Sequence, residues 1–90
     1  MFNLRSSTWP KSQLRADWAV YRALADLLID ARLEAGLNQT ELGARLGVTQ
    51  KFISVIETGA RRVDLLEFLA IEYALGLPRF SLVKRLDEHL

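Results

Sequence analysis

The sequence predicts a single all-α domain built from five helices. Apolar residues recur at spacings of three and four, the period of helices that bury one face. Glycines interrupt this pattern at Gly36, Gly47, Gly59 and Gly76, and helix-capping residues follow most of these interruptions. No strand-like alternation of apolar and polar residues competes with it. The 90 residues, 50% of them hydrophobic, suffice for one compact core.

Composition excludes several kinds of functional site. The chain has no cysteine, which excludes disulfides, thiolate zinc sites and a cysteine nucleophile, and fits a cytoplasmic protein. No signal peptide is evident, and no run of about 18 apolar residues is available to span a membrane. The formal net charge is only +1, but residues 45–62 hold four basic residues against one acid, a local net charge of +3. We expect no metal, no cofactor and no membrane contact.

The N-terminal part is expected to be a short arm followed by one long helix. Residues 1–9 lack helical periodicity and are expected to form a flexible arm, whereas residues 10–90 form the domain. Pro10 suits the first turn of an extended first helix that continues to Ala35 and ends at Gly36. Its apolar stripe comprises Leu14, Trp18, Tyr21, Leu24, Leu28 and Ala31.

A short second helix is expected to follow at once. Asn38 can accept a backbone N–H as N-cap, and Glu41 completes a pair typical of a capping box. Leu42 and Leu46 provide the inward face, and Gly47 ends the helix.

The third helix is expected over 50–58, with Thr49 as its N-cap. Ile53 and Ile56 lie on one side of it, and Gly59 closes it. The residues expected largely on the other side are Gln50, Lys51, Ser54 and Val55.

Two further helices are expected in the C-terminal part. Asp64 and Glu67 repeat the capping pattern before the fourth helix, which Gly76 terminates, and Pro78 is well placed to start the fifth. The inward residues predicted for the fourth helix are Leu65, Phe68, Leu69 and Leu75. Those predicted for the fifth are Phe80, Val83, Leu86 and Leu90, with Arg79, Lys84 and Arg85 outside.

The second and third helices are expected to form a helix-turn-helix at about 39–57. The two helices of such a motif approach each other closely, so the residue of the first helix at the point of contact must be small. Gly43 fits this position. The turn needs a residue with positive φ, which Gly47 adopts without a steric penalty, and Val48 then fills the core. This arrangement leaves the start of the 50–58 helix on the surface.

Helix-capping, small, turn and helix-ending residues follow one another in a set order in the segments GLNQTELGARLGVTQ, ISVIETG and ALG. In this order of residues, the sequence resembles the Cro/phage-repressor (XRE-type) helix-turn-helix DNA-binding family. The resemblance covers roughly residues 28–78. It implies a lambda-repressor-like DNA-binding domain, with double-stranded DNA as the partner and the start of the third helix in the major groove.

The resemblance also implies roles for individual residues. Gln50 resembles the family's adenine reader, since a carboxamide can pair with adenine N6 and N7, and Gln39 resembles its phosphate-binding glutamine. Lys51 can contact guanine or only a phosphate, whereas Phe52 can lie against the sugar-phosphate backbone or in the core. The implied base contacts are Thr49, Gln50, Lys51, Ser54 and Val55. The implied phosphate contacts are Asn38, Gln39, Arg45, Phe52, Arg61 and Arg62.

A buried ion pair is expected between the first and third helices. Arg32 falls inside the apolar stripe of the first helix, where an unpaired guanidinium is costly, and Glu57 ends the third helix on its inner side. The family commonly joins these two positions.

The function expected from these features is sequence-specific transcriptional regulation, more as a repressor than as an activator, by a homodimer on a palindromic operator. The dimer seam is expected either on the C-terminal helix, through Phe80, Leu82, Leu86 and Leu90, or on the extended first helix with its tryptophans. The alternative is an antitoxin or adaptor whose main role is to bind a protein partner. An enzyme is not expected, since no catalytic motif is present.

Overall fold

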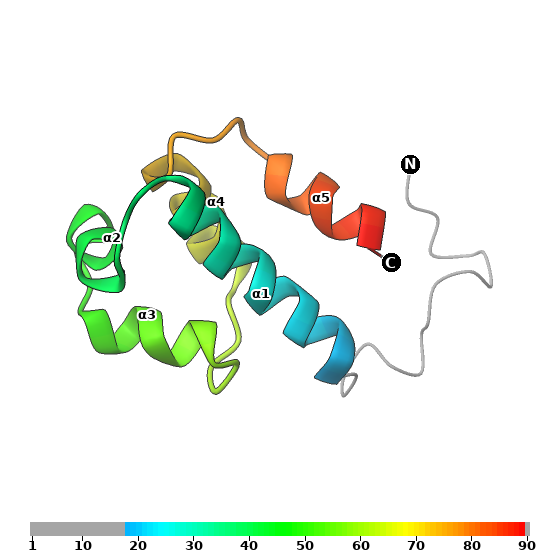
Figure 1. Ribbon diagram of the computed structural model, residues 1–90, viewed down its shortest axis with the longest axis horizontal. Helices are drawn as coiled ribbons and strands as arrows, with labels where there is room; N and C mark the ends of the chain where they lie inside the picture. The colour runs from blue at the N-terminus through cyan, green and yellow to red at the C-terminus, as the bar shows by residue number, and fades with distance from the viewer. Residues whose placement is uncertain (1–17, 90) are drawn as a thin grey trace.

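The computed structural model describes residues 18–89, and this part of the chain is a five-helix, strand-free fold (Figure 1). The helices are α1 (Trp18–Glu34), α2 (Gln39–Leu46), α3 (Gln50–Glu57), α4 (Leu65–Ala74) and α5 (Ser81–His89). The all-α prediction is therefore confirmed. The expected arm at 1–9 and the start of the first helix at Pro10 lie outside the described residues.

Helix α1 is the centre of the arrangement. It packs against α3 and α5, which lie on opposite sides of it in Figure 1, while α2 packs against α3 and α4. The core lies where these helices meet. Its buried members are Leu27, Leu28, Ala31, Leu37, Leu42, Ile53, Ile56, Phe68, Ile71, Leu75 and Leu82.

The helix starts agree with the capping pattern of the sequence. Asn38 caps α2 and Asp64 caps α4, each within a complete capping box, and Thr49 accepts the N–H of Phe52 at the start of α3. The α2–α3 turn passes through Gly47, whose φ of 72° lies in the left-handed region. Local chemistry therefore sets these boundaries.

The buried face of α4 differs from the prediction at two residues, Leu65 and Leu69. Leu69 is only half-buried. Phe68 and Leu75 are buried as expected, together with Ile71, but Leu65 is 65% exposed. Leu65 is the first residue of the helix and lies before the buried stripe, which consists of Phe68, Ile71 and Leu75. The sequence of α4 is apolar on almost every side, so its periodicity does not select the face.

Helix α5 begins later than predicted, and its inward face agrees with the prediction only at Leu86, which packs partly against the core. Leu90 lies outside the described residues. The helix starts at Ser81 rather than at Pro78, and the residue fully buried is Leu82, at 0% exposure. Phe80 and Val83, predicted to face inward, are 52% and 41% exposed. Since Leu82 belongs to the core, the C-terminal dimer seam predicted from the sequence cannot include it in this fold.

The carboxylate of Glu72 explains this register. Its Oε1 accepts the N–H of Phe80 at 2.8 Å, and its Oε2 accepts the N–H of Leu82 at 2.9 Å. Glu72 is itself buried on α4, with 1% exposure, so these bonds fix the first turn of α5 against α4. Phe80 adopts a φ of 70° immediately before the helix, a left-handed conformation that is uncommon for a residue with a side chain.

Candidate functional site

Helices α2 and α3 approach each other through a glycine. A Cβ placed on Gly43 would lie 2.8 Å from the carbonyl oxygen of Val48 and 3.3 Å from the carbonyl carbon of Thr49. The Val48 N–H also donates to the Gly43 carbonyl at 2.9 Å. Both neighbouring groups are backbone and cannot move aside, so the predicted need for a small residue at Gly43 is confirmed.

Helix α3 has one buried side and one accessible side. Ile53 and Ile56 are each 2% exposed and anchor the helix in the core, as the sequence predicted. Gln50 and Lys51 are exposed at its start. Ser54 and Val55 are half-buried one turn further on. A polar surface therefore lies at the N-terminal end of this helix.

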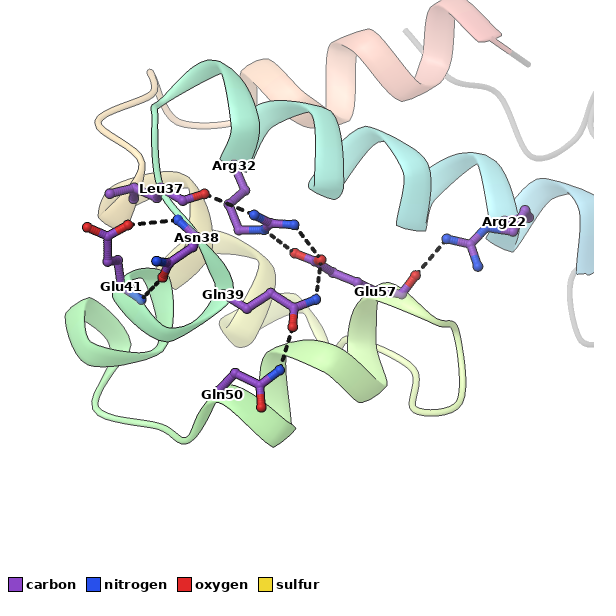
Figure 2. Close-up of polar contacts among 8 residues, drawn as sticks. All are labelled: Arg22, Arg32, Leu37, Asn38, Gln39, Glu41, Gln50 and Glu57. Atoms are coloured by element: carbon purple, nitrogen blue, oxygen red, sulfur yellow. Dashed lines mark hydrogen bonds and ion pairs between the residues drawn. The ribbon is translucent and has the colours of Figure 1, made fainter.

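The buried ion pair predicted between α1 and α3 is present (Figure 2). Arg32 donates from Nε to Glu57 Oε2 at 2.7 Å and from Nη2 to Oε1 at 2.9 Å. Its Nη1 donates to the Leu37 carbonyl at 2.9 Å. The hydrogen bond with Glu57 raises the pKa of the Arg32 guanidinium above its ordinary value, against the opposing effect of burial.

The ion pair continues into a chain of carboxamides that reaches the surface. Gln39 donates from Nε2 to Glu57 Oε1 at 2.8 Å, and Gln50 donates from Nε2 to Gln39 Oε1 at 2.6 Å (Figure 2). The Gln50 carboxamide has a second N–H and an oxygen that points away from Gln39 in Figure 2. This adjacent donor and acceptor are the pair that adenine N7 and N6 require.

Arg22, which the sequence did not single out, ties α1 to the other end of α3. Its Nη2 donates to the Glu57 carbonyl at 2.6 Å and its Nη1 to the Thr58 carbonyl at 3.2 Å. A cation at the carbonyl end of a helix is favourable because it satisfies orphan acceptors and opposes the helix dipole. No local sequence signal reveals this contact, since Arg22 lies on a different helix.

The loop after α3 is fastened to α1 by Tyr21. The Tyr21 hydroxyl donates to the Arg61 carbonyl at 3.1 Å and accepts the Val63 N–H at 2.9 Å. The Arg62 guanidinium lies over the Tyr21 ring, 4.8 Å from its centroid. The sequence predicted Tyr21 as a core residue, and its hydroxyl also holds the loop after α3 through these hydrogen bonds.

Arg61 is engaged by α3 and α4. Its guanidinium lies over the Phe52 ring, 4.7 Å from the centroid, and forms an ion pair with Glu67 at 2.7 Å. The hydrogen bonds from Arg61 are the main cause that lowers the pKa of Glu67, and the same pairing raises the pKa of Arg61. Phe52 packs partly against the core, which is one of its two predicted environments, and its contact with the DNA backbone stays a prediction.

Two further predicted phosphate contacts have structural partners. Arg45 donates from Nη1 to the Ala74 carbonyl at the end of α4, at 2.8 Å. Asn38 accepts the N–H of Glu41 at 2.7 Å in the capping box of α2. The structure brings Asn38, Gln39 and Gln50 to one end of the helix pair, whereas Arg45 contacts α4. The base and phosphate contacts themselves stay predictions.

Other kinds of site receive no support from residues 18–89. Within that range, no three metal-ligating side chains gather closely enough to hold an ion. The helices described there also lack the length and apolar character required to cross a bilayer.

Comparison with known proteins identifies relatives of this arrangement. The helix-turn-helix family model HTH_3 matches residues 28–82. The HTH-type transcriptional regulator y4dJ of Sinorhizobium fredii, itself uncharacterized, is 37% identical over 57 residues, which are 63% of this chain and 74% of that protein.

Solved structures have the same fold. An XRE-family like protein from Pseudomonas syringae pv. tomato superposes with a TM-score of 0.73 at 42% identity, over 79% of this chain and 87% of that one. A mutant of a restriction-modification controller protein superposes with a TM-score of 0.71, over 78% of this chain and 89% of that one. At 21% identity, the second likeness concerns the fold alone.

Proposed function

Because the chain belongs to the Cro/C1-type (XRE) helix-turn-helix family of DNA-binding transcriptional regulators, we propose that it represses transcription by binding a specific operator through α3. The observation that carries this proposal is the hydrogen-bonded chain from Arg32 to Gln50. It holds the carboxamide of an exposed residue in one orientation, with a donor and an acceptor directed outward. A base reader of this kind gains specificity because its orientation is fixed before binding.

The proposal assigns Gln50 to an adenine and the neighbouring accessible residues of α3 to adjacent bases. Gln39 and Asn38, at the positive end of the α2 dipole, bind a phosphate of the DNA backbone. The proposed base contacts are Thr49, Gln50, Lys51, Ser54 and Val55. The proposed phosphate contacts are Asn38, Gln39, Arg45, Phe52, Arg61 and Arg62.

A homodimer on a palindromic operator is part of the proposal. One recognition helix covers only a few base pairs, so two half-sites about 34–36 Å apart are needed for useful specificity. Exposed apolar residues support such an interface: Tyr73 is 87% exposed on α4, and Phe80 and Val83 flank the start of α5. A dimer of this size represses by occupying a promoter, and we place it in the cytoplasm with the DNA.

Selection from random duplexes, followed by mobility-shift titration, tests the proposal. The wild type is expected to enrich a palindrome, and Gln50→Ala to lose preference at one base pair in each half-site, a change of about 10- to 100-fold. Lys51→Ala is expected to weaken binding, whereas the same substitution on α5, Lys84→Ala, serves as the control and leaves it unchanged. Equal affinity of the wild type for every duplex contradicts sequence-specific recognition.

An antitoxin or adaptor role is the second candidate, and the exposed apolar surface of α4 favours it. Leu65, Leu66 and Tyr73 are 65%, 77% and 87% exposed on this short helix, and such surfaces commonly bind proteins. Affinity purification under native conditions tests this candidate. A stoichiometric partner that is retained by the wild type and lost from Tyr73→Ser supports it, whereas recovery of the homodimer alone supports the repressor.

A further inference from the structure

One ion pair beside α3 occupies a residue that the proposed function assigns to DNA. Arg61 donates from Nη1 to Glu67 Oε1 at 2.8 Å and from Nη2 to Oε2 at 2.7 Å. Its Nη1 also donates to the Arg62 carbonyl at 3.2 Å. These bonds use three of the five N–H donors of the guanidinium. Its stacking on Phe52 places the cation directly beside α3.

Glu67 is held in place independently of Arg61. Its Oε1 accepts the backbone N–H of Asp64 at 3.1 Å, while Asp64 Oδ1 accepts the backbone N–H of Glu67 at 2.8 Å. This capping box anchors the carboxylate at the start of α4. A phosphate that approaches Arg61 must therefore displace the carboxylate or share the cation with it.

We propose that Glu67 restrains Arg61 and thereby lowers the affinity of the protein for the DNA backbone. The proposal rests on the DNA-binding function proposed above and adds a negative determinant to it. An arginine already neutralised by a carboxylate displaces fewer counterions from DNA, so it contributes less of the salt-dependent affinity. Glu67 is thus a positioning residue that acts through Arg61, and it limits the affinity of the loop after α3 for DNA phosphates.

Glu67→Gln isolates the charge from the capping role. The carboxamide oxygen can still accept the Asp64 N–H, as in capping boxes that use glutamine, while the negative charge is removed. Glu34→Gln is the matched control because it makes the same charge change in another exposed ion pair, with Arg85. That pair joins α1 to α5, and α5 lies on the opposite side of α1 from α3 (Figure 1).

The experiment measures dissociation constants for the selected operator and for an unrelated duplex over a range of salt concentrations. Glu67→Gln is expected to bind both duplexes about fivefold more tightly near 100 mM salt, with a log–log salt slope steeper by about 0.9 for each subunit bound, as for one additional neutralised phosphate per subunit. Glu34→Gln is expected to keep the wild-type slope. Unchanged affinity and slope in Glu67→Gln, or weaker binding, overturns the proposal.

A second pair of variants tests whether the effect passes through Arg61. In an Arg61→Gln background, adding Glu67→Gln is expected to give no further gain, because the restrained cation is absent. An equal gain in both backgrounds indicates long-range charge alone and overturns the proposal. The thermal transition of each variant shows that it is folded.

Failure of the proposed function gives a different result. In that case the wild type shows no preference among duplexes, and Gln50→Ala changes nothing. If only the inference about Glu67 is wrong, recognition that depends on Gln50 persists while Glu67→Gln behaves like Glu34→Gln.

Discussion

Arg32 and Glu57 form a buried ion pair, with two hydrogen bonds, that joins the last turns of α1 and α3. The glutamate has a second task, since its Oε1 also accepts a hydrogen bond from Gln39, which in turn accepts one from Gln50. The same carboxylate therefore stabilises the domain and orients the exposed end of α3. Substitutions at the buried end of this series of hydrogen bonds are expected to affect folding, and those at its exposed end are expected to affect DNA recognition.

Arg32→Met is expected to lower the free energy of unfolding by about 3–5 kcal/mol, because it leaves the Glu57 charge buried without its partner. Urea denaturation measures the change. Arg85→Met is the control, since its ion pair with Glu34 is exposed and is expected to contribute no more than about 1 kcal/mol. We expect Arg32→Met to lose DNA binding through misfolding. An unchanged melting temperature together with full binding contradicts this account of the pair.

Gly43→Ala is expected to destabilise the protein by about 1–3 kcal/mol, although alanine normally stabilises the interior of a helix. The added Cβ would lie 2.8 Å from the Val48 carbonyl oxygen, so α2 and α3 must separate. Ala44→Gly, at the exposed neighbouring position, is expected to cost only about 0.5–1 kcal/mol from helix propensity. Thermal and urea unfolding of both variants measure the difference. A Gly43→Ala protein more stable than the wild type shows that the contact tolerates a side chain.

Gln39→Ala is expected to relax base preference at the same base pair as Gln50→Ala, because Gln39 holds the Gln50 carboxamide. The two substitutions share one interaction, so their effects on operator discrimination are expected to be less than additive in the double variant. Competition titrations against operators changed at single positions measure this. Thr40→Ala, on the exposed side of α2, is the control for helix stability. Strict additivity indicates that Gln50 reads its base without help from Gln39.

Acid is expected to weaken the fold through Glu67. Arg61 lowers the pKa of Glu67 in the folded protein below the ordinary value of 4.5, so the unfolded chain binds more protons in this range. The stabilisation is therefore present above about pH 4.5 and is lost as the pH falls through the lower folded pKa. Urea denaturation at several pH values is expected to show the stability gap between the wild type and Glu67→Gln shrinking as acid is added. A constant gap contradicts a charge-dependent contribution from this group.

The sequence predicted those features that depend on neighbours along the chain. Asn38 and Asp64 cap helices through groups three residues ahead, and Gly47 needs only its own left-handed conformation, so local pattern identifies all three. The Arg32–Glu57 pair was also predicted, because a charge inside an apolar stripe requires a partner. These local features, together with the ion pair, also allowed the sequence to predict that the start of α3 is exposed.

Features that depend on distant backbone groups were missed. In the sequence, Glu72 is indistinguishable from an acidic residue on a helix surface, yet its carboxylate accepts hydrogen bonds from N–H groups eight and ten residues later. The start of α5 was predicted wrongly for this reason, since Leu82 rather than Phe80 turns inward once Glu72 holds the helix start, whereas Leu86 packs against the core as predicted. Similarly, Arg22 and Tyr21 contact carbonyls and amides near residues 57–63, which no periodicity in α1 reveals.

The hydrogen bonds that Glu72 accepts from Phe80 and Leu82 also mean that α5 cannot be removed without affecting α4. A truncated protein ending before Phe80 would keep the Glu72 carboxylate with both of its amide donors removed, and a buried carboxylate without partners destabilises the fold unless water reaches it. Shortened versions made to map the proposed dimer interface would therefore damage α4 as well as delete α5. Point substitutions at Phe80 or Val83, which leave those amides in place, are the sounder way to probe that surface.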